Sequence, residues 1–600
     1  MQRSPRKGPV RALAQNQWGL AILFGVAALV LGPPLLMMVL IGAKFQFLQD
    51  PGVLDQAQIA RNLMDGKGWF VTSLIRPLSM GIRAEISNHP DLYNPPGYVL
   101  YLAAIYKSFG ATDRGTVFGA AALWVLNIWL TFVAGLRWFD RRVAILATVF
   151  MALNVAGLVS VVQGYSVWMS TLFVMLLCLI SFGARESSEQ PSIAAEPSLA
   201  PLSEPAGPRR LRPRIDAVSA GPTTGPEPVA VMEPTPRPLP VWAAGAVGAL
   251  LSLAFLSQYQ ILPAAIVLLA WLARRESILG GSPLFLGLGF AVPILPWMVR
   301  NTLVGGWPVL SLFWYEAIAA TPGYPGDSVF RYVTIADRPL VYPILHPGQI
   351  HEKMVTTMAA YRDQIGSIYD PLIVALGAAY LFGRPTAKRS LQMMRWPIGL
   401  AFTATVLSSA WFRPDASVLI TFTPFTSILA AASLLLVVFP RLTVRYWIGK
   451  IRITPSFLRA AVGTVTVLIV ATPFWYYIRI ARPATQTSPR DSIVSAARQI
   501  PSGGYILANE PAMFAWHSGR PSVMLPQRLE DLATMEQNFT PPKGAFITPQ
   551  IGQFPARERG TWWFWIASGQ GVFRGLRPVQ GGANGVVWVR DAGGAAASSP

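Results

Sequence analysis

The sequence predicts a polytopic α-helical membrane protein that ends in a small α/β domain outside the membrane. Of its 600 residues, 52% are hydrophobic and only 13% are charged. The mean hydropathy is +0.42, so the chain is far more apolar than a soluble protein. The net charge of +20 does not indicate a nucleic-acid partner, because the basic residues stand mostly in short links between hydrophobic segments. The single cysteine, Cys178, excludes intramolecular disulfides and cysteine-rich metal sites.

Apolar runs recur along the chain, and about eleven of them are long enough to cross roughly 30 Å of hydrocarbon. They lie near 18–43, 115–136, 143–162, 165–184, 240–258, 260–273, 281–299, 367–383, 396–412, 416–439 and 459–479. We expect the first run to be a transmembrane helix and not a signal peptide, because no small-residue cleavage site follows it. The segment 98–110 is apolar but short and contains Lys107, which predicts an interfacial helix.

The basic residues set the orientation of these spans. With the N-terminus inside, the Lys and Arg residues fall on the inner links and the short outer links have almost none. The inner residues are Arg3, Arg6, Lys7, Arg11, Arg137, Arg141, Arg142, Arg185, the basic run 209–214, Arg274, Arg275, Arg384, Lys388, Arg389, Arg395, Arg441, Arg445, Lys450 and Arg452. This orientation places both large loops and the C-terminal tail on the outer face.

Composition divides the chain into four parts. They are a membrane part at 1–184 with a first outer loop at 44–114, a cytoplasmic loop at 185–238, a second membrane part at 239–481 with an outer loop at 300–366, and an outer domain at 482–600. The loop 185–238 is rich in Pro, Ser, Ala and Glu, which predicts disorder because it has too little apolar surface to bury. In the tail we expect strands at 504–508, 522–525, 545–548 and 586–589, and helices at 511–518 and 528–537.

The first outer loop carries an unusual set of polar residues for a membrane protein. Asp50 and Asp55 follow the first span, and a rigid Pro95-Pro96 turn closes the loop. Acidic residues are costly beside a bilayer, so the loop indicates a site built at the membrane surface. A second feature is the run Leu-Pro-Trp-Met-Val-Arg-Asn that ends at Asn301. Its Arg300 is a planar, permanently charged donor at the depth of a lipid phosphate, although a structural arginine that reaches the interface would look the same.

The first outer loop resembles that of the GT-C glycosyltransferases, polytopic enzymes related to protein O-mannosyltransferases and the lipid A aminoarabinose transferase. The run ending at Asn301 is similar to their Pro-Trp-x-x-Arg-Asn signature, and the segment 508–521 is similar to the C-terminal domains of many bacterial members. The resemblance implies an inverting hexosyl- or pentosyltransferase in the inner (plasma) membrane of a bacterium, with its active site outside. Its partners are membrane lipids and a polyprenyl-phosphate sugar donor, and the acceptor is a lipid, glycan or protein.

The resemblance also implies roles for individual residues. An acid early in the first loop is the base; we expect Asp55, at a site that faces water, and Asp50 as second choice. A helix-capping role is the alternative for Asp55. Arg300 is the expected ligand of the donor phosphate, with Arg413 as a second ligand or as the ion-pair partner of Asp415. The expected substrate-binding residues are His89, Tyr93, Tyr98, Asn301, Tyr315 and Glu316. For the last two, the alternative is that they are solvated loop residues.

One departure from the family pattern concerns metals. Many relatives carry a second acid outside the third span, but the corresponding stretch 163–170 has none. His346, His351 and Glu352 stand close in sequence, but three polar residues on a loop are rarely a metal site. We therefore expect no cofactor, and the sequence does not support a divalent metal.

Two other functions remain open at this point. A transporter or flippase of lipid-linked sugars has a similar span count, but it places charged groups near mid-membrane and shows internal repeats, which we do not find. A non-catalytic GT-C relative is the other alternative, because the second acid is missing.

The topology is directly testable. Reporter fusions at Pro226 and Asp591 should give opposite signals, inside and outside respectively, because of the Lys and Arg asymmetry. Matching signals from the two fusions would rule out this arrangement.

Overall fold

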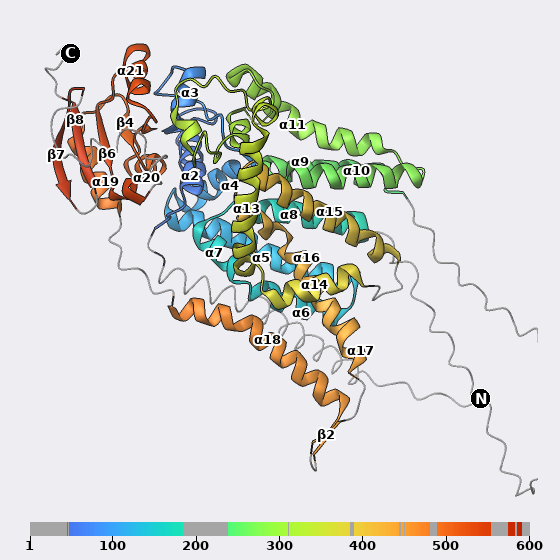
Figure 1. The fold of residues 1–600 in the computed structure, drawn as a ribbon. Coiled ribbons are helices and arrows are strands. Elements are labelled where there is room, and N and C mark those ends of the chain that lie inside the picture. The colour runs from blue at the N-terminus through green and yellow to red at the C-terminus, as the bar shows by residue number, and fades with distance from the viewer. Residues whose placement is uncertain are drawn as a thin grey trace, which may run out of the picture.

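The computed structural model describes residues 45, 47–183, 238–309, 311–383, 389–442, 446–448, 451–480, 489–553, 574–582 and 585–590. The predicted first span at 18–43 and nearly all of the loop 185–238 lie outside these residues. The described chain forms a bundle of helices and a mixed β-sheet that lies at one end of it (Figure 1).

Each predicted span after the first coincides with a helix or with consecutive helices. They are α5 (Asp113–Trp138), α6 (Arg141–Ala152), α7 (Val155–Gln163), α8 (Val167–Gly183), α9 (Val241–Ser257), α10 (Leu262–Ile278), α11 (Pro283–Gly305), α14 (Pro371–Phe382), α15 (Arg389–Trp411), α16 (Thr423–Ser433), η5 (Leu434–Val438), α17 (Phe439–Arg441) and α18 (Pro455–Ile480). Shorter elements join them, namely η1 (Tyr259–Ile261), η2 (Ser311–Ala317), η3 (Ser328–Arg331), α12 (Tyr342–Leu345), α13 (Pro347–Ile368), η4 (Ala416–Phe422), β2 (Tyr446–Ile448) and β3 (Ile451–Ile453).

The structure contains fewer helices long enough to span a membrane, among the described residues, than the sequence predicts. Among the described residues, four helices are long and apolar enough to cross a membrane, or up to six if each of two bent pairs is one span. The bent pairs are α6 with α7, at 51°, and α13 with α14, at 104°. The expected count of about eleven spans is therefore not confirmed, because several apolar runs fold as shorter helices.

Capping residues explain the break between α6 and α7. Asn154 accepts a hydrogen bond from the Gly157 N–H at 2.6 Å, which starts α7, and donates to the Ile368 carbonyl at 3.0 Å. Gly164 ends α7 with a φ of 78°, a conformation that suits glycine. The turn at Gly164 brings residues 165–167 to the outer end of the bundle, where they reach the candidate site described below.

The first outer loop folds into three helices, α2 (Pro51–Met64), α3 (Pro77–Ile82) and α4 (Pro96–Phe109). Each begins with proline, whose missing N–H would be unpaired at that position anyway. Asp50 caps α2 by accepting a hydrogen bond from the Val53 N–H at 2.9 Å. The segment 98–110 is helical as predicted, although its position relative to a membrane remains a prediction.

Six strands form one sheet in the order β1-β5-β4-β6-β8-β7. They are β1 (Leu74–Ile75), β4 (Ile506–Ala508), β5 (Ser522–Met524), β6 (Gly544–Ile547), β7 (Leu576–Gly582) and β8 (Gly585–Arg590), flanked by α19 (Pro489–Gln499), α20 (Pro511–Ser518), α21 (Leu529–Asn538) and η6 (Pro549–Gln553). The strands and helices predicted in the tail are present. The sheet is nevertheless not built by the tail alone, because β1 comes from the first outer loop and pairs in parallel with β5.

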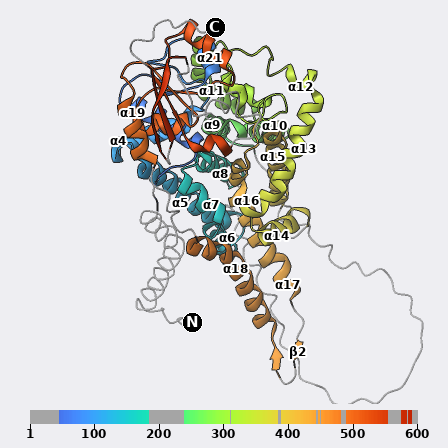
Figure 2. The same ribbon diagram turned by 60° about the vertical axis from the view of Figure 1, so that its left-hand side comes forward.

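Two arginines hold the sheet against the outer loops. Arg61 of α2 donates to the carbonyls of Trp516, at 2.6 Å, and Ala515, at 3.0 Å, at the end of α20. Its guanidinium lies 4.7 Å from the centre of the Trp516 ring. Arg331, from the second outer loop, donates to the Leu525 carbonyl at 2.7 Å. Figure 2 shows the resulting arrangement, with the sheet at one end of the bundle and β2 at the other.

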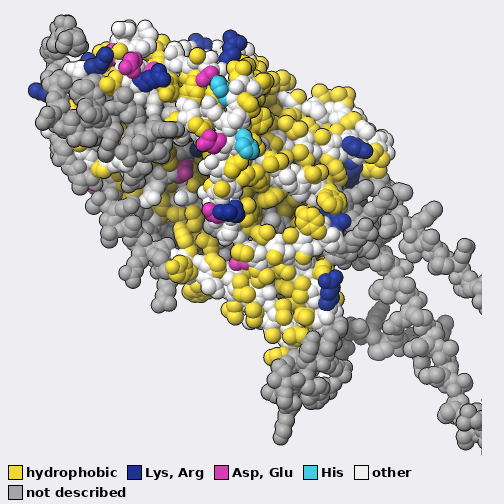
Figure 3. All heavy atoms as spheres, in the orientation of Figure 1, with side chains coloured by type: hydrophobic (Ala, Val, Ile, Leu, Met, Phe, Trp, Pro, Cys, Tyr) yellow, Lys and Arg dark blue, Asp and Glu magenta, His cyan; other side chains and the backbone are white. Residues whose placement is uncertain are grey.

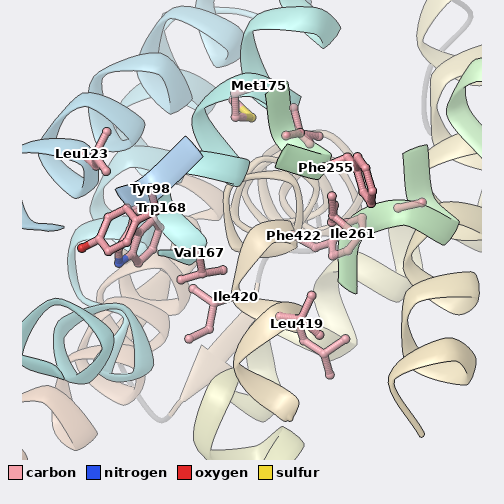
Figure 4. Packing of buried hydrophobic residues seen from close by; sticks show 14 of the residues in the cluster. Tyr98, Leu123, Val167, Trp168, Met175, Phe255, Ile261, Leu419, Ile420 and Phe422 are labelled. Carbon is pink, nitrogen blue, oxygen red and sulfur yellow. The ribbon is translucent and has the colours of Figure 1, made fainter. Parts of the chain in front are cut away.

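The core runs through the helical part. Large buried side chains include Tyr98 and Trp168, both labelled in Figure 4. On the outside, hydrophobic side chains cover much of the bundle, while many charged ones lie toward the end that carries the sheet (Figure 3). Along α11 the exposed apolar residues include Leu284, Leu288 and Val292. Large apolar side chains exposed along a helix in this way indicate contact with lipid.

Glycines allow α9 and α11 to approach closely. A Cβ atom on Gly289 of α11 would collide with the Gly245 carbonyl oxygen of α9, and one on Gly248 would collide with the Leu286 carbonyl oxygen of α11. Small residues at such crossings are typical of helices packed in membranes. In contrast, a Cβ atom on Gly287, also in α11, would meet no atom within 4 Å.

We therefore predict that Gly289→Ala lowers the thermal unfolding temperature, because it forces the two backbones apart at a cost of about 1–3 kcal/mol. Gly287→Ala is the matched control and should be neutral or slightly stabilising, since alanine favours helix over glycine. Unfolding curves of the purified proteins test this. Equal unfolding temperatures for Gly289→Ala and wild type would contradict the close packing of α9 and α11.

Candidate active site

A cavity of about 590 Å³ opens where the first outer loop meets the ends of the bundle helices. Its wall is formed by the start of α2, the turn before α4, the α7–α8 turn, the α9–α10 connection, and the residues between α15 and η4. Part of the apolar lining comes from Val167 and Ile420, which lie side by side in Figure 4. Three charged side chains line the cavity among the described residues: Asp50, Arg413 and Asp415.

Asp50 is the acid of the first loop that reaches the cavity. The N-cap bond from Val53 fixes its carboxylate at the start of α2. Burial raises the pKa of Asp50, and the Val53 N–H and the positive charge of Arg413 offset part of that effect. A carboxylate with a raised pKa binds a proton more readily, which suits a general base.

Arg413 is the cation of the cavity. Its Nη1 donates to the Tyr93 hydroxyl at 2.9 Å, and Tyr93 in turn donates to the Glu316 carboxylate. The other guanidinium N–H groups of Arg413 have no protein acceptor in the described part of the chain, so they can bind an anion in the cavity. Burial raises the pKa of Glu316, while Arg413 and the Tyr93 hydroxyl act in the opposite direction.

A buried lysine fixes the two segments that carry these groups. The ammonium of Lys353, on α13, donates to the carbonyls of Glu316 and Phe412, each at 2.6 Å. Burial lowers the pKa of Lys353 to about 8, although the charge of Glu316 acts in the opposite direction. Because Phe412 directly precedes Arg413, Lys353 positions the guanidinium without touching the cavity.

Asp415 supplies a second acid from an unexpected place. The sequence has no acid in the stretch 163–170, yet Asp415 lines the cavity together with Tyr165. Its Oδ1 accepts a hydrogen bond from the Ser417 N–H at 2.9 Å. Among the described residues, no ion pair within 4 Å joins it to Arg413, which is bonded to Tyr93 instead. The charge of Asp415 contributes to the raised pKa of Asp50.

Asp55, the first choice for the base, does not face water. Its side chain is only 1% exposed and does not line the cavity. Its carboxylate forms an ion pair with Arg76 at 2.8 Å and accepts hydrogen bonds from Asn94, at 2.8 Å, and Gln58, at 3.0 Å. The expectation of a solvent-facing Asp55 is wrong, and so is the capping alternative, because Asp50 is the N-cap of α2.

Helix periodicity explains the difference between the two acids. Gly52, Val53 and Gln56 line the cavity from one side of α2. Asp55, Gln58 and Asn62, spaced by three and four residues, form a hydrogen-bonded row on another side. Asp55 therefore contacts the cavity only indirectly. It accepts a hydrogen bond from Asn94, which lines the cavity and also donates to Asp91.

Arg300 lies behind the cavity wall. Its Nη1 donates to the Asp91 carbonyl at 2.6 Å and to Asn301 Oδ1 at 3.1 Å, and its guanidinium lies 4.8 Å from the centre of the Trp297 ring. The Nη2 group is buried without a hydrogen-bond partner among the described residues. Arg300 therefore supports the loop that carries Asn94, and its role as a phosphate ligand stays a prediction.

The other predicted substrate-binding residues separate into two groups. Tyr93 lines the cavity, and Glu316 lies directly behind it. His89, buried, contacts Ser79 and the Glu85 carbonyl, and Tyr98 donates to the Gly164 carbonyl at 2.7 Å. Tyr315 and Asn301 do not line the cavity either, so these four residues are not brought to it.

Sequence reasoning missed several residues of the site. Gln56, Asn94, Tyr165 and Gln260 all line the cavity, and Lys353 supports it. Asn94 follows Tyr93 and precedes the Pro95-Pro96 turn, so it belonged to a segment already singled out. No local signal marks Lys353, because its partners come from distant parts of the chain.

The described residues contain no group of three or more His, Cys, Asp or Glu side chains that could hold a metal ion. His346, His351 and Glu352 thus form no such cluster.

No protein-family model matches the sequence, and no curated protein matches it. Among solved structures, the chain is similar to ArnT from Cupriavidus metallidurans bound to undecaprenyl phosphate, at 13% identity and a TM-score of 0.50, over 96% of this chain and 98% of that one. The archaeal oligosaccharyltransferase AglB from Archaeoglobus fulgidus, in complex with an inhibitory peptide and a dolichol-phosphate, matches at 11% identity and a TM-score of 0.49, over 88% of this chain and 70% of that one. By its likeness to ArnT over nearly its whole length, the chain has the fold of the GT-C glycosyltransferases.

Proposed function

We propose that this protein is a membrane glycosyltransferase that transfers a sugar from a polyprenyl-phosphate donor to an acceptor on the outer face of a bacterial inner membrane. The observation that carries the proposal is the meeting of Asp50, Arg413 and Asp415 in one cavity. A partly buried acid and a cation with free donors are the two groups that such a transfer needs.

The chemistry follows from the positions of these groups. Asp50 takes the proton from the acceptor hydroxyl or amine, and the freed lone pair attacks the anomeric carbon of the sugar. The bond between that carbon and the phosphate oxygen breaks, and the polyprenyl phosphate leaves with the bonding electrons. Arg413 stabilises the negative charge that builds on the phosphate. Attack opposite to the leaving group inverts the anomeric centre.

The fold supports this assignment. ArnT, which shares it, was solved with undecaprenyl phosphate bound. The sugar of such a donor stays close to the bilayer because its prenyl chain lies in it. The cavity lies at the ends of apolar helices and beneath the outer loops, which suits a donor whose sugar stays close to the bilayer.

The competing functions have less support. A transporter would carry its charged groups near the middle of the helices. In contrast, Asp50 is the N-cap of α2, and Arg413 and Asp415 lie between α15 and η4. A non-catalytic relative was suggested by the missing acid in the stretch 163–170. Asp415 now provides a second acid in the cavity.

The decisive variant is Asp50→Asn. Asparagine keeps the shape and the helix cap, so the protein should fold normally. We expect sugar transfer to fall by about a hundredfold or more, because the base is lost. In the wild type, transfer should decline as the pH falls through the raised pKa of Asp50, so the acidic limb should lie above the 3.8 of an ordinary aspartate. That limb should disappear in Asp50→Asn.

Asp55→Asn is the matched control on the same helix. It breaks the buried ion pair with Arg76, so it should lower the unfolding temperature. Transfer per folded molecule should also fall, because Asn94 and Arg76 lose their charged partner, but by less than in Asp50→Asn, since the base itself is retained. If Asp55→Asn abolished transfer in folded protein while Asp50→Asn retained it, Asp55 would be the base. If neither changed transfer, the cavity would not be the active site.

A further inference from the structure

Two carboxamide side chains line the cavity with unused hydrogen-bonding groups. Gln56, on the cavity side of α2, is 9% exposed, and Gln260, in η1, is 8% exposed. Gln56 has no side-chain hydrogen bond among the described residues. Gln260 accepts one from Gln258 at 3.1 Å through its Oε1, but its amino group has no partner in the same part of the chain.

Neighbouring glutamines show how such side chains behave when they are structural. Gln58, two residues from Gln56, donates to Asp55 and Thr72 and accepts from Ser73. Gln258 accepts from Ser170 and donates to Gln260. The free groups of Gln56 and Gln260 are therefore not a general feature of buried glutamines in this protein.

Amide groups that line a cavity without a protein partner are open to a ligand or to water, which can complete their hydrogen bonds. Gln56 comes from the first outer loop and Gln260 from the α9–α10 connection, so the two amides reach the cavity from separate elements. An amide offers a donor and an acceptor side by side, which matches the hydroxyl groups of a sugar.

We propose that Gln56 and Gln260 form the subsite for the sugar of the donor, and that this sugar carries no negative charge. The inference rests on the proposed function. Among the described residues that line the cavity, three are charged: Asp50, Arg413 and Asp415. Arg413, the cation among them, is bonded to Tyr93 and meets the phosphate in the proposed reaction. A uronic acid would therefore bring a carboxylate beside Asp50 and Asp415 with no second cation among these residues to pair with it, and burying such a charge unpaired is unfavourable.

Equilibrium binding to the full-length protein in lipid nanodiscs tests the subsite without knowledge of the acceptor. The probes are a polyprenyl phosphate without sugar, and the same carrier bearing mannose, galactose, arabinose, glucosamine or glucuronic acid. We expect the bare carrier to bind, at least one neutral donor to bind about tenfold tighter, and the glucuronic acid donor to gain nothing over the bare carrier.

The variants Gln56→Leu and Gln260→Leu should each weaken binding of the best neutral donor by about tenfold and leave the affinity for the bare carrier unchanged. Gln260→Glu keeps the shape but replaces the free donor with a negative charge. It should also weaken the binding of the neutral donor, and it should strengthen the binding of the glucosamine donor. The control is Gln58→Leu, which should lower the unfolding temperature but keep the ratio of the two affinities.

Each failure has its own meaning. If no probe binds, including the bare carrier, both the proposed function and the proposed subsite are wrong. If the bare carrier binds but no neutral sugar adds affinity, or the glucuronic acid donor binds most tightly, the subsite is wrong while the donor class stands. Equal losses for sugar-bearing and bare carrier in the Gln56 and Gln260 variants would also overturn the proposal.

Discussion

The arrangement of the site depends on the buried ion pair between Arg76 and Asp55, whose atoms approach to 2.8 Å. Arg76 directly follows β1, so it stands at the edge of the sheet, while Asp55 belongs to α2. The guanidinium also lies 4.0 Å from the centre of the Tyr93 ring, and Asp55 holds Asn94. One pair thus connects the sheet, the first helix of the outer loop and two residues of the cavity. Separating it would leave charges buried without partners, which is strongly unfavourable.

A second set of bonds holds the opposite wall. Lys353 joins the backbone at Glu316 to the backbone at Phe412, and Tyr93 links the Glu316 side chain to Arg413. The charged group that meets the donor phosphate in our proposal is therefore held from two directions. Fixed charges of this kind need no reorganisation when negative charge develops on the leaving phosphate, which is the physical basis of electrostatic catalysis. Gln56 and Gln260 line the same cavity, and their carboxamides keep hydrogen-bonding groups free for a ligand.

Local patterns in the sequence predicted most helices and strands, because hydrophobic runs and turn residues act over short distances. The resemblance to the GT-C family pointed to Asp50, Tyr93 and Arg413, all of which reach the cavity. It also favoured Asp55, on the wrong side of α2, because that helix carries polar residues on two sides and only tertiary contacts decide which one meets the cavity. The two-residue strand β1 was missed for a similar reason, since its pairing with β5 joins segments far apart in the chain.

The most direct test of the account is a structure of the full-length protein in nanodiscs with a polyprenyl phosphate bound. We predict phosphate oxygens within about 3 Å of the free guanidinium nitrogens of Arg413, with the Asp50 carboxylate beside the same space and the prenyl chain leaving toward the apolar helix surface. A phosphate bound outside this cavity, with Arg413 still bonded only to Tyr93, would contradict the account.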